Sequence, residues 1–130
     1  MIDFRLNVSS GVPTYVQIVQ QVQQAIRLGL LQPGDQLPTV KTVVVQLAIN
    51  PNTVLKAYNE LESEGLVEGR RGQGTFVSNR FPPVAALRND ALHDALTRWI
   101  AQAREEGLTE DEIVALMVDT TRVVFARRIA

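Results

Sequence analysis

Segment 50–66 constrains the fold more than any other part of this 130-residue chain, because both of its ends are marked in the sequence. Asn50 is a favoured helix N-cap, since its side-chain oxygen can accept a free backbone N–H, and Pro51 suits the first helical position. Gly65 readily adopts the left-handed conformation in which many helices end. Between these ends, apolar residues recur at helical spacing: Val54, Ala57, Tyr58 and Leu61. The segment therefore predicts one short helix that turns a single face to a core.

The remaining face of this helix forms a small polar tip with one cation. Its outward-facing residues are Asn50, Pro51, Asn52, Thr53, Leu55 and Lys56. Amides and hydroxyls can pair with base edges in the DNA major groove, whereas a lysine and the free N–H groups of a helix start can bind phosphates. Such a tip suits a DNA-reading helix. An ordinary capped surface helix would look the same, and the segment alone favours neither interpretation.

Composition permits one modest domain, or a small domain with an appendage, since 45% of the residues are hydrophobic. No cysteine occurs, which excludes disulfides, thiolate metal sites and a cysteine nucleophile. No apolar run approaches the length that spans a bilayer, so we expect a cytoplasmic protein without a membrane partner. The net charge of −1 does not favour nucleic acid, and a DNA-binding surface therefore has to arise from local clusters such as Arg70 with Arg71.

Two further helices are predicted before segment 50–66. The first runs from Pro13 to about Leu31, with a glutamine-rich face that we expect to be solvated. Its apolar stripe consists of Tyr15, Ile18, Val19, Val22, Ile26 and Leu30. Residues 36–38 should be extended, because a residue that precedes proline avoids the helical region. Thr39 can then cap a second helix to about Leu47, followed by a tight turn into Asn50. The residues of this helix expected to face inward are Val40, Val43, Val44 and Leu47.

Segment 66–77 consists of two short apolar runs around a basic loop with glycines, which predicts a β-hairpin. Arg70 and Arg71 should lie at its tip, where the glycines allow the backbone to approach another molecule closely. Glycine-rich loops can also bind nucleotide phosphates. The spacing of Gly69, Gly72 and Gly74 fits neither the motif that ends in Gly-Lys-Thr nor a strand–turn–helix context, so nucleotide binding is not expected.

The order helix, short strand, helix, tight turn, helix and hairpin is that of a winged helix-turn-helix. Residues 10–78 resemble the GntR family of bacterial transcription regulators, and the matching segments are 13–18, 29–38, 48–58, 61–67 and 71–77. The resemblance implies DNA contacts by the tip of segment 50–66, by Lys41 and by the wing residues Arg70, Arg71, Gly72, Gln73, Gly74 and Thr75. The second helix departs from the family pattern, because Thr42 replaces a glutamate that would close a capping box with Thr39.

The C-terminal part is predicted to be a separate domain. Residues 79–88, with Pro82 and Pro83, predict a stiff linker between a DNA-binding domain (residues 1–78) and a two-helix domain (residues 89–130). Its helices should run from about Asn89 to Glu106 and onward from a capping box at Thr109. Two helices cannot bury a core alone, so we expect a homodimer. The predicted dimerisation residues are Leu92, Leu96, Trp99, Ile100, Leu116, Met117, Val123 and Val124. The tail resembles that of the YtrA subfamily, in which it dimerises.

No residue pattern in the chain favours catalysis or a cofactor. His93 lies close to Asp90 and Asp94, but metal sites normally draw more nitrogen or sulfur ligands from several elements, so we expect an exposed polar face and no metal. The sequence carries no recognisable nucleophilic arrangement, and an enzyme is therefore not expected. Trp99 fits a core or dimer contact better than a ligand-stacking role.

The predicted fold class is mainly α with a small β-hairpin, a winged helix-turn-helix followed by a two-helix dimerisation tail. The predicted function is a sequence-specific regulator that binds double-stranded DNA as a homodimer. By resemblance it would repress its own operon or a transporter operon from an inverted-repeat operator. The sequence leaves open both the existence and the identity of a small-molecule effector. The alternative is a winged-helix adaptor that binds proteins and not DNA. Such an adaptor would need neither the cations nor the polar tip.

Overall fold

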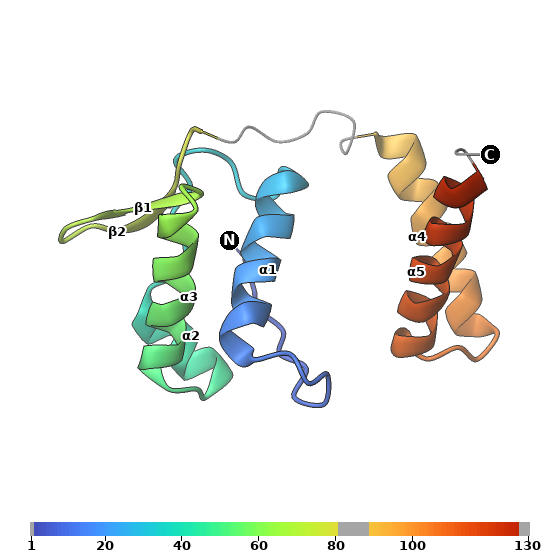
Figure 1. Cartoon of the computed structure of the whole chain (residues 1–130), viewed down its shortest axis with the longest axis horizontal. Coiled ribbons are helices and arrows are strands. Elements are labelled where there is room, and N and C mark those ends of the chain that lie inside the picture. The colour runs from blue at the N-terminus through green and yellow to red at the C-terminus, as the bar shows by residue number, and fades with distance from the viewer. Residues whose placement is uncertain (1, 81–88, 128–130) are drawn as a thin grey trace. The chain divides into compact units, whose positions relative to one another are not determined.

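The computed structural model describes residues 2–80 and 89–127, which belong to two compact units, Met1–Arg88 and Asn89–Ala130 (Figure 1). The first unit contains α1 (Thr14–Arg27), α2 (Val40–Leu47), α3 (Pro51–Ser63), β1 (Val67–Arg70) and β2 (Gly74–Val77). The second unit contains α4 (Asp90–Glu105) and α5 (Glu110–Arg127). The predicted class, mainly α with a small hairpin, is confirmed. Residues 81–88, which hold most of the predicted linker, lie outside the described residues.

Helix α3 is the centre of the first unit and begins and ends as the sequence predicts. The Asn50 side chain accepts a hydrogen bond from the backbone N–H of Asn52 at 2.8 Å. At the other end, Gly65 has a φ of 80°, and the N–H of Leu66 donates to the carbonyl of Leu61, which satisfies a free carbonyl of the last turn. All four residues of the predicted stripe are buried: Val54, Ala57, Tyr58 and Leu61.

Helices α1 and α2 pack against this buried face. Ile18 and Val22 of α1 and Val43 of α2 are fully buried, and they join the stripe of α3 in one core. The Tyr58 hydroxyl donates a 2.6 Å hydrogen bond to the carbonyl of Pro38. Burial raises the pKa of Tyr58, so the phenol keeps the proton that makes this bond. The tyrosine thereby ties α3 to the extended segment that enters α2.

Helix α1 is shorter than predicted, and Leu30 is not part of its buried face. The helix ends at Arg27, because Gly29 has a φ of 78° and the N–H groups of Leu30 and Leu31 both turn back to the carbonyl of Ala25. The chain leaves the helical path at this point. Leu31 is therefore buried, whereas Leu30 is 72% exposed.

The prediction of a solvated glutamine face on α1 is wrong for two residues, which hold the N-terminal arm. Gln17 is buried, and its amide both accepts from the N–H and donates to the carbonyl of Asn7, at 2.8 and 3.0 Å. Gln21 does the same with the backbone of Arg5, beside the buried Phe4. The N-terminal arm has no regular secondary structure, so its backbone N–H and carbonyl groups form hydrogen bonds with side chains of α1 instead. The periodicity of apolar residues in the sequence does not reveal such contacts.

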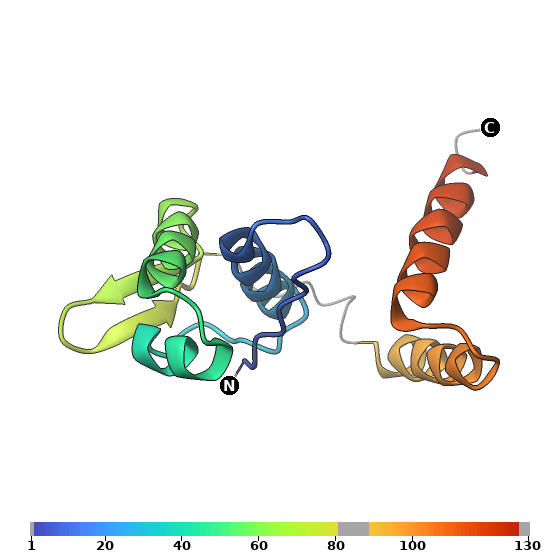
Figure 2. The same cartoon turned by 90° about the horizontal axis from the view of Figure 1, so that it is seen from below.

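Helix α2 is capped by Thr39, whose hydroxyl accepts from the backbone N–H of Thr42 at 3.1 Å. The two hydroxyls also hydrogen-bond at 2.8 Å, so Thr42 supports the cap without the glutamate of the family pattern. The turn from α2 into α3 is as tight as predicted (Figure 2). Within it, Ala48 has a φ of 53° and a ψ of 48°, a left-handed conformation that is unfavourable for a residue with a β-carbon.

The predicted hairpin is formed by β1 and β2 in antiparallel order and projects from the helices (Figure 1). The extended segment before α2 lies along β2. There the N–H of Leu37 donates to the carbonyl of Thr75, and Gln36 forms an isolated bridge with Phe76. The predicted extended residues 36–38 therefore support the wing on the outer edge of β2.

The second unit is a pair of helices with little buried surface. The predicted capping box starts α5, because the Thr109 hydroxyl and the Glu112 carboxylate each accept from the backbone N–H of the other residue. The hydrogen bond from the Thr109 backbone N–H, followed by one from the Thr109 side chain, lowers the pKa of the Glu112 carboxyl. Among the described residues of this unit, only Ala103 and Ile113 are buried. No helix in residues 2–80 and 89–127 is long and apolar enough to cross a membrane.

We expect Ala48→Gly to raise the free energy of unfolding of the first unit by about 0.5–1 kcal/mol, because glycine removes a left-handed penalty that exceeds its own entropic cost. Urea denaturation followed by circular dichroism measures the change. Ala48→Val is the matched control and should unfold at a lower urea concentration, since a β-branched side chain fits this conformation less well than alanine. A lower midpoint for the glycine variant would contradict a strained turn at Ala48.

Candidate nucleic-acid interface

The start of α3 exposes most of the residues predicted to read DNA bases. Pro51 and Asn52 are exposed, Thr53 is half-buried, and Leu55 is 45% exposed although it lies beside the buried stripe. Asn50 differs from these residues, because its side-chain oxygen is occupied by the N-cap bond. The groups that remain for base edges are the Asn52 amide and the Thr53 hydroxyl, while Leu55 can contact a thymine methyl.

Lys56 lies on the exposed side of α3, next to the first turn of α1. Its ammonium is 4.1 Å from the centre of the Tyr15 ring, so the lysine is held by a cation–π contact. The ring occupies one side of the ammonium, and the exposed side retains N–H groups that can donate to a phosphate oxygen. The structure therefore restricts the orientation of this predicted phosphate ligand.

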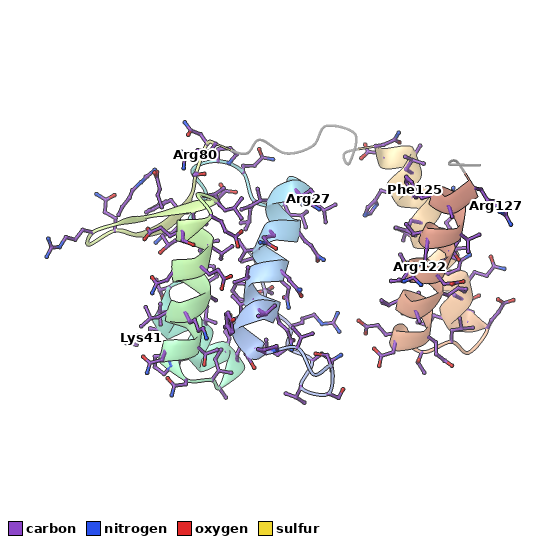
Figure 3. All side chains as sticks on the ribbon, in the orientation of Figure 1. Arg27, Lys41, Arg80, Arg122, Phe125 and Arg127 are labelled. Carbon is purple, nitrogen blue, oxygen red and sulfur yellow. The ribbon has the colours of Figure 1, made fainter. Side chains whose placement is uncertain are left out.

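The start of α2 and the hairpin border one concave surface. A hollow of about 530 Å³ is lined by Thr39 and by residues 69–75. Lys41, which follows Thr39 on the first turn of α2, is exposed on the side toward which the hairpin projects (Figure 3). Thr39, which caps α2, and the two wing arginines thus line the same hollow, whereas Lys41 is not part of its lining.

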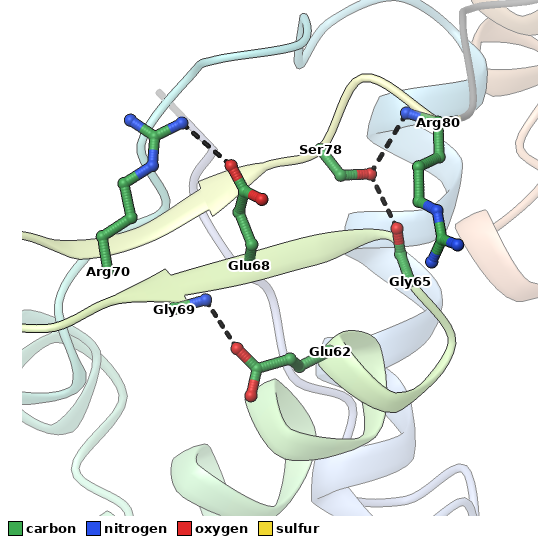
Figure 4. A network of polar contacts seen from close by, with 7 residues as sticks. All are labelled: Glu62, Gly65, Glu68, Gly69, Arg70, Ser78 and Arg80. Carbon is green, nitrogen blue, oxygen red and sulfur yellow. Dashed lines mark hydrogen bonds and ion pairs between the residues drawn. The ribbon is translucent and has the colours of Figure 1, made fainter.

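Arg70 ends β1, and its side chain turns back along the strand instead of lying at the tip as predicted. Its guanidinium forms a 2.9 Å ion pair with Glu68 (Figure 4) and covers the Phe76 ring at 4.3 Å from the ring centre. Residues 68 and 70 share one face of β1, and Phe76 pairs with Glu68 across the hairpin, so the three side chains meet. Arg70 is therefore engaged within the wing before any DNA arrives.

The tip of the wing consists of Arg71, Gly72 and Gln73, all of which are exposed. Gly72 has a φ of 74°, and the N–H of Gln73 closes the turn on the carbonyl of Arg70 at 2.8 Å. Gly74 and Thr75 are half-buried where β2 begins. The prediction of an arginine at the tip is therefore correct for Arg71, whose guanidinium can meet a phosphate.

The histidine of α4 lies on an exposed face. Nδ1 of His93 is 3.9 Å from the Asp94 carboxylate, and both side chains are exposed to solvent. In the part of the chain that the structure describes, no three histidine, aspartate or glutamate side chains converge to hold a metal ion.

The predicted dimerisation residues lie on exposed apolar surfaces of α4 and α5. A groove of about 490 Å³ is lined by Leu96, Trp99, Leu116, Met117, Thr120, Thr121, Val124 and Phe125. Ile100 lines a second groove of about 440 Å³, to which Met117 also contributes. Leu92 and Val123 are exposed as well. Sequence reasoning missed Phe125, although the four-residue spacing from Met117 through Thr121 could have identified it.

The fold and these surfaces define a winged helix-turn-helix protein, in which α2 and α3 form the helix-turn-helix and the hairpin is the wing. Residues 14–77 match the family described as "Bacterial regulatory proteins, gntR family". The chain belongs to this GntR family. It is accordingly a DNA-binding transcriptional regulator and not an enzyme.

Two proteins of Bacillus subtilis are similar to the chain over most of their length. The transcriptional repressor YtrA is 45% identical over 105 residues, which cover 80% of this chain and 81% of YtrA. The transcriptional regulator YhcF is 38% identical over 105 residues, which cover 81% of this chain and 87% of YhcF. The similarity to both therefore extends beyond the winged helix-turn-helix into the C-terminal part.

Solved structures support the same assignment. YtrA from Sulfolobus acidocaldarius, a GntR-family transcription factor, has a TM-score of 0.56 and 30% identity, with 94% of this chain and 97% of that chain covered. The DNA-binding domain of AraR in complex with operator ORE1 has a TM-score of 0.50 and 28% identity, with 60% and 95% covered. The predicted resemblance to the GntR family and its YtrA-like members is confirmed.

We expect Glu68→Gln to tighten binding of duplex DNA by about two- to fivefold at low salt, because it breaks a surface ion pair and releases Arg70. Fluorescence anisotropy with a labelled duplex of arbitrary sequence measures the affinity. Glu60→Gln is the matched control, since it removes the same charge from the exposed side of α3, where no ion pair to Glu60 occurs among the described residues. Equal gains from both variants would show that net charge, and not the release of Arg70, determines the affinity.

Proposed function

We propose that the chain is a repressor that binds an inverted-repeat operator as a homodimer. The observation that carries the proposal is the exposed polar start of α3 together with cations on two adjacent elements, Lys41 and Arg71. In the proposed complex α3 enters the major groove, where Asn52 and Thr53 meet base edges. The start of α2 and the wing contact the phosphates on either side of the groove, which fixes the register of α3 on the duplex.

A homodimer is supported by the apolar surface that the second unit leaves uncovered. Trp99 is 40% exposed and Leu96 is 44% exposed, and both line the larger groove with Phe125. An apolar surface of this kind on a small helix pair marks an interaction site. A second copy offers the same side chains, so a two-fold arrangement would cover both surfaces at once. Two copies of α3 would then engage two half-sites of opposite orientation.

Repression is supported by the similarity to YtrA of Bacillus subtilis, which is a transcriptional repressor. A dimer on an operator that overlaps a promoter would exclude the polymerase from that promoter. By family resemblance the regulated genes would be its own operon or a transporter operon. Any small-molecule effector would act at the dimer interface or on linker residues 79–88, by changing the separation of the two α3 helices.

Asn52→Ala should weaken binding to a specific operator by about 1–3 kcal/mol and leave binding to unrelated DNA nearly unchanged, because base contacts carry sequence information. The operator for this comparison is a duplex selected from a random pool by the wild-type chain. Arg71→Ala is the contrasting variant and should weaken binding to both duplexes. It should also reduce the magnitude of the slope of log K against log salt concentration by about 2 for the dimer, since two phosphate contacts are lost. Equal losses for Asn52→Ala on both duplexes would show that Asn52 only positions the helix.

Trp99→Ala should destabilise the dimer by about 2–4 kcal/mol, because a large aromatic side chain at the centre of an interface contributes strongly to association. Sedimentation velocity over a concentration series measures the monomer–dimer equilibrium. Gln102→Ala is the matched control on the same helix, since this exposed residue lines neither groove. A Trp99→Ala chain that sediments like the wild type would remove the groove from the interface.

A further inference from the structure

One side chain connects the DNA-reading helix directly to the wing. Glu62 lies on the last turn of α3, and its Oε2 accepts a hydrogen bond from the backbone N–H of Gly69 in β1 at 2.5 Å (Figure 4). Hydrogen bonds from amides to carboxylates are charge-assisted, and are therefore shorter and stronger than neutral ones. The contact gives the outer edge of β1 a partner that belongs to α3.

Glycine at position 69 gives the Glu62 carboxylate room to make this contact. A β-carbon on Gly69 would lie 2.9 Å from Oε2 of Glu62, which is closer than such atoms approach in proteins. The φ of Gly69 is not positive, so the backbone conformation does not require glycine here. The missing side chain instead allows the carboxylate to reach the strand.

The remaining restraints on the wing act at its other edge, at its base and at its tip, where the Gln36 side-chain amide donates to the carbonyl of Gln73 at 3.1 Å. The backbone of Leu37 holds β2 through Thr75, and the Ser78 hydroxyl donates to the carbonyl of Gly65 at 2.7 Å. Glu62 adds a restraint at the edge of β1, between this base and the tip. Arg71 lies beyond Gly69 on the projecting hairpin. A small rotation of the hairpin would therefore displace the Arg71 guanidinium farther than it displaces Gly69.

We propose that Glu62 is a positioning residue for operator binding, whose hydrogen bond to Gly69 sets the angle between α3 and the wing. This angle places Arg71 on the phosphate backbone while α3 lies in the major groove. The inference rests on the wing contact of the proposed function. It gives a favourable role to a negative charge on the DNA-binding unit, although electrostatics alone would make any glutamate near DNA unfavourable.

Three substitutions separate position from charge. Glu62→Ala removes both the acceptor and the charge, whereas Glu62→Gln removes the charge and keeps an oxygen acceptor. Gly69→Ala leaves every charge in place and forces the carboxylate, at the end of a flexible side chain, away from the amide. Glu60→Ala is the matched control, because it removes an equal charge from the same helix, and among the described residues no hydrogen bond or ion pair joins the Glu60 side chain to the wing.

The probe is the duplex selected from a random pool by the wild-type chain, and the readout is fluorescence anisotropy at fixed salt. We expect Glu62→Ala and Gly69→Ala to weaken binding about three- to tenfold, with Glu62→Gln close to wild type and Glu60→Ala no weaker than wild type. Hydrogen exchange of the Gly69 amide should accelerate in the first two variants only, while the circular dichroism spectrum stays unchanged. Wild-type or tighter binding by Glu62→Ala would overturn the proposal.

A double-mutant cycle with Arg71→Ala tests whether Glu62 acts through the wing. In the Arg71→Ala chain, Glu62→Ala should cause little further loss, because the group that it positions is absent. An equal loss in both backgrounds would overturn the positioning role and leave the proposed function intact. If Arg71→Ala alone binds like the wild type, the wing contact of the proposed function is overturned, and the positioning role falls with it.

Discussion

The burial of one face of α3 is the interaction on which the rest of the first unit depends. Val54, Ala57 and Leu61 are completely buried, and α1 and α2 pack on the surface that they form. A helix that buries one stripe necessarily leaves the opposite side in solvent. The contacts that stabilise the unit therefore also determine which residues of α3 are available to DNA, and in which direction the exposed start of the helix points.

Features that depend on short-range signals could be predicted from the sequence. The cap at Asn50, the left-handed Gly65 and the capping box at Thr109 each require only neighbours in the chain. Long-range contacts could not be predicted in this way. Gln17 looks like a surface residue in a helical pattern, yet it is buried because an arm ten residues earlier needs its amide.

In the candidate site, the positions of the helices and strands could be predicted from the sequence, but the directions of several side chains could not. The exposed residues of α3 and the hairpin were predicted because periodicity defines the face and the register of an element. The side-chain directions within the wing were not, since they depend on pairs across strands and between elements. Arg70 was expected at the tip and instead lies against Glu68 and Phe76, and the contact between Glu62 and Gly69 has no signature in a pattern of apolar residues.

The exposed groove of α4 and α5 would make the abundance of this regulator part of its mechanism. The concentration of a homodimer rises with the square of the monomer concentration, so dilution would dissociate the proposed dimer. The monomer would then lose the extra affinity that comes from binding two half-sites of one operator at once. Operator occupancy would then increase more steeply than the amount of protein. If the proposed repressor acts on its own operon, the dissociation constant of the dimer would be one of the quantities that determine its cellular level, and the side chains of Trp99 and Phe125, which line this groove, would contribute to that constant.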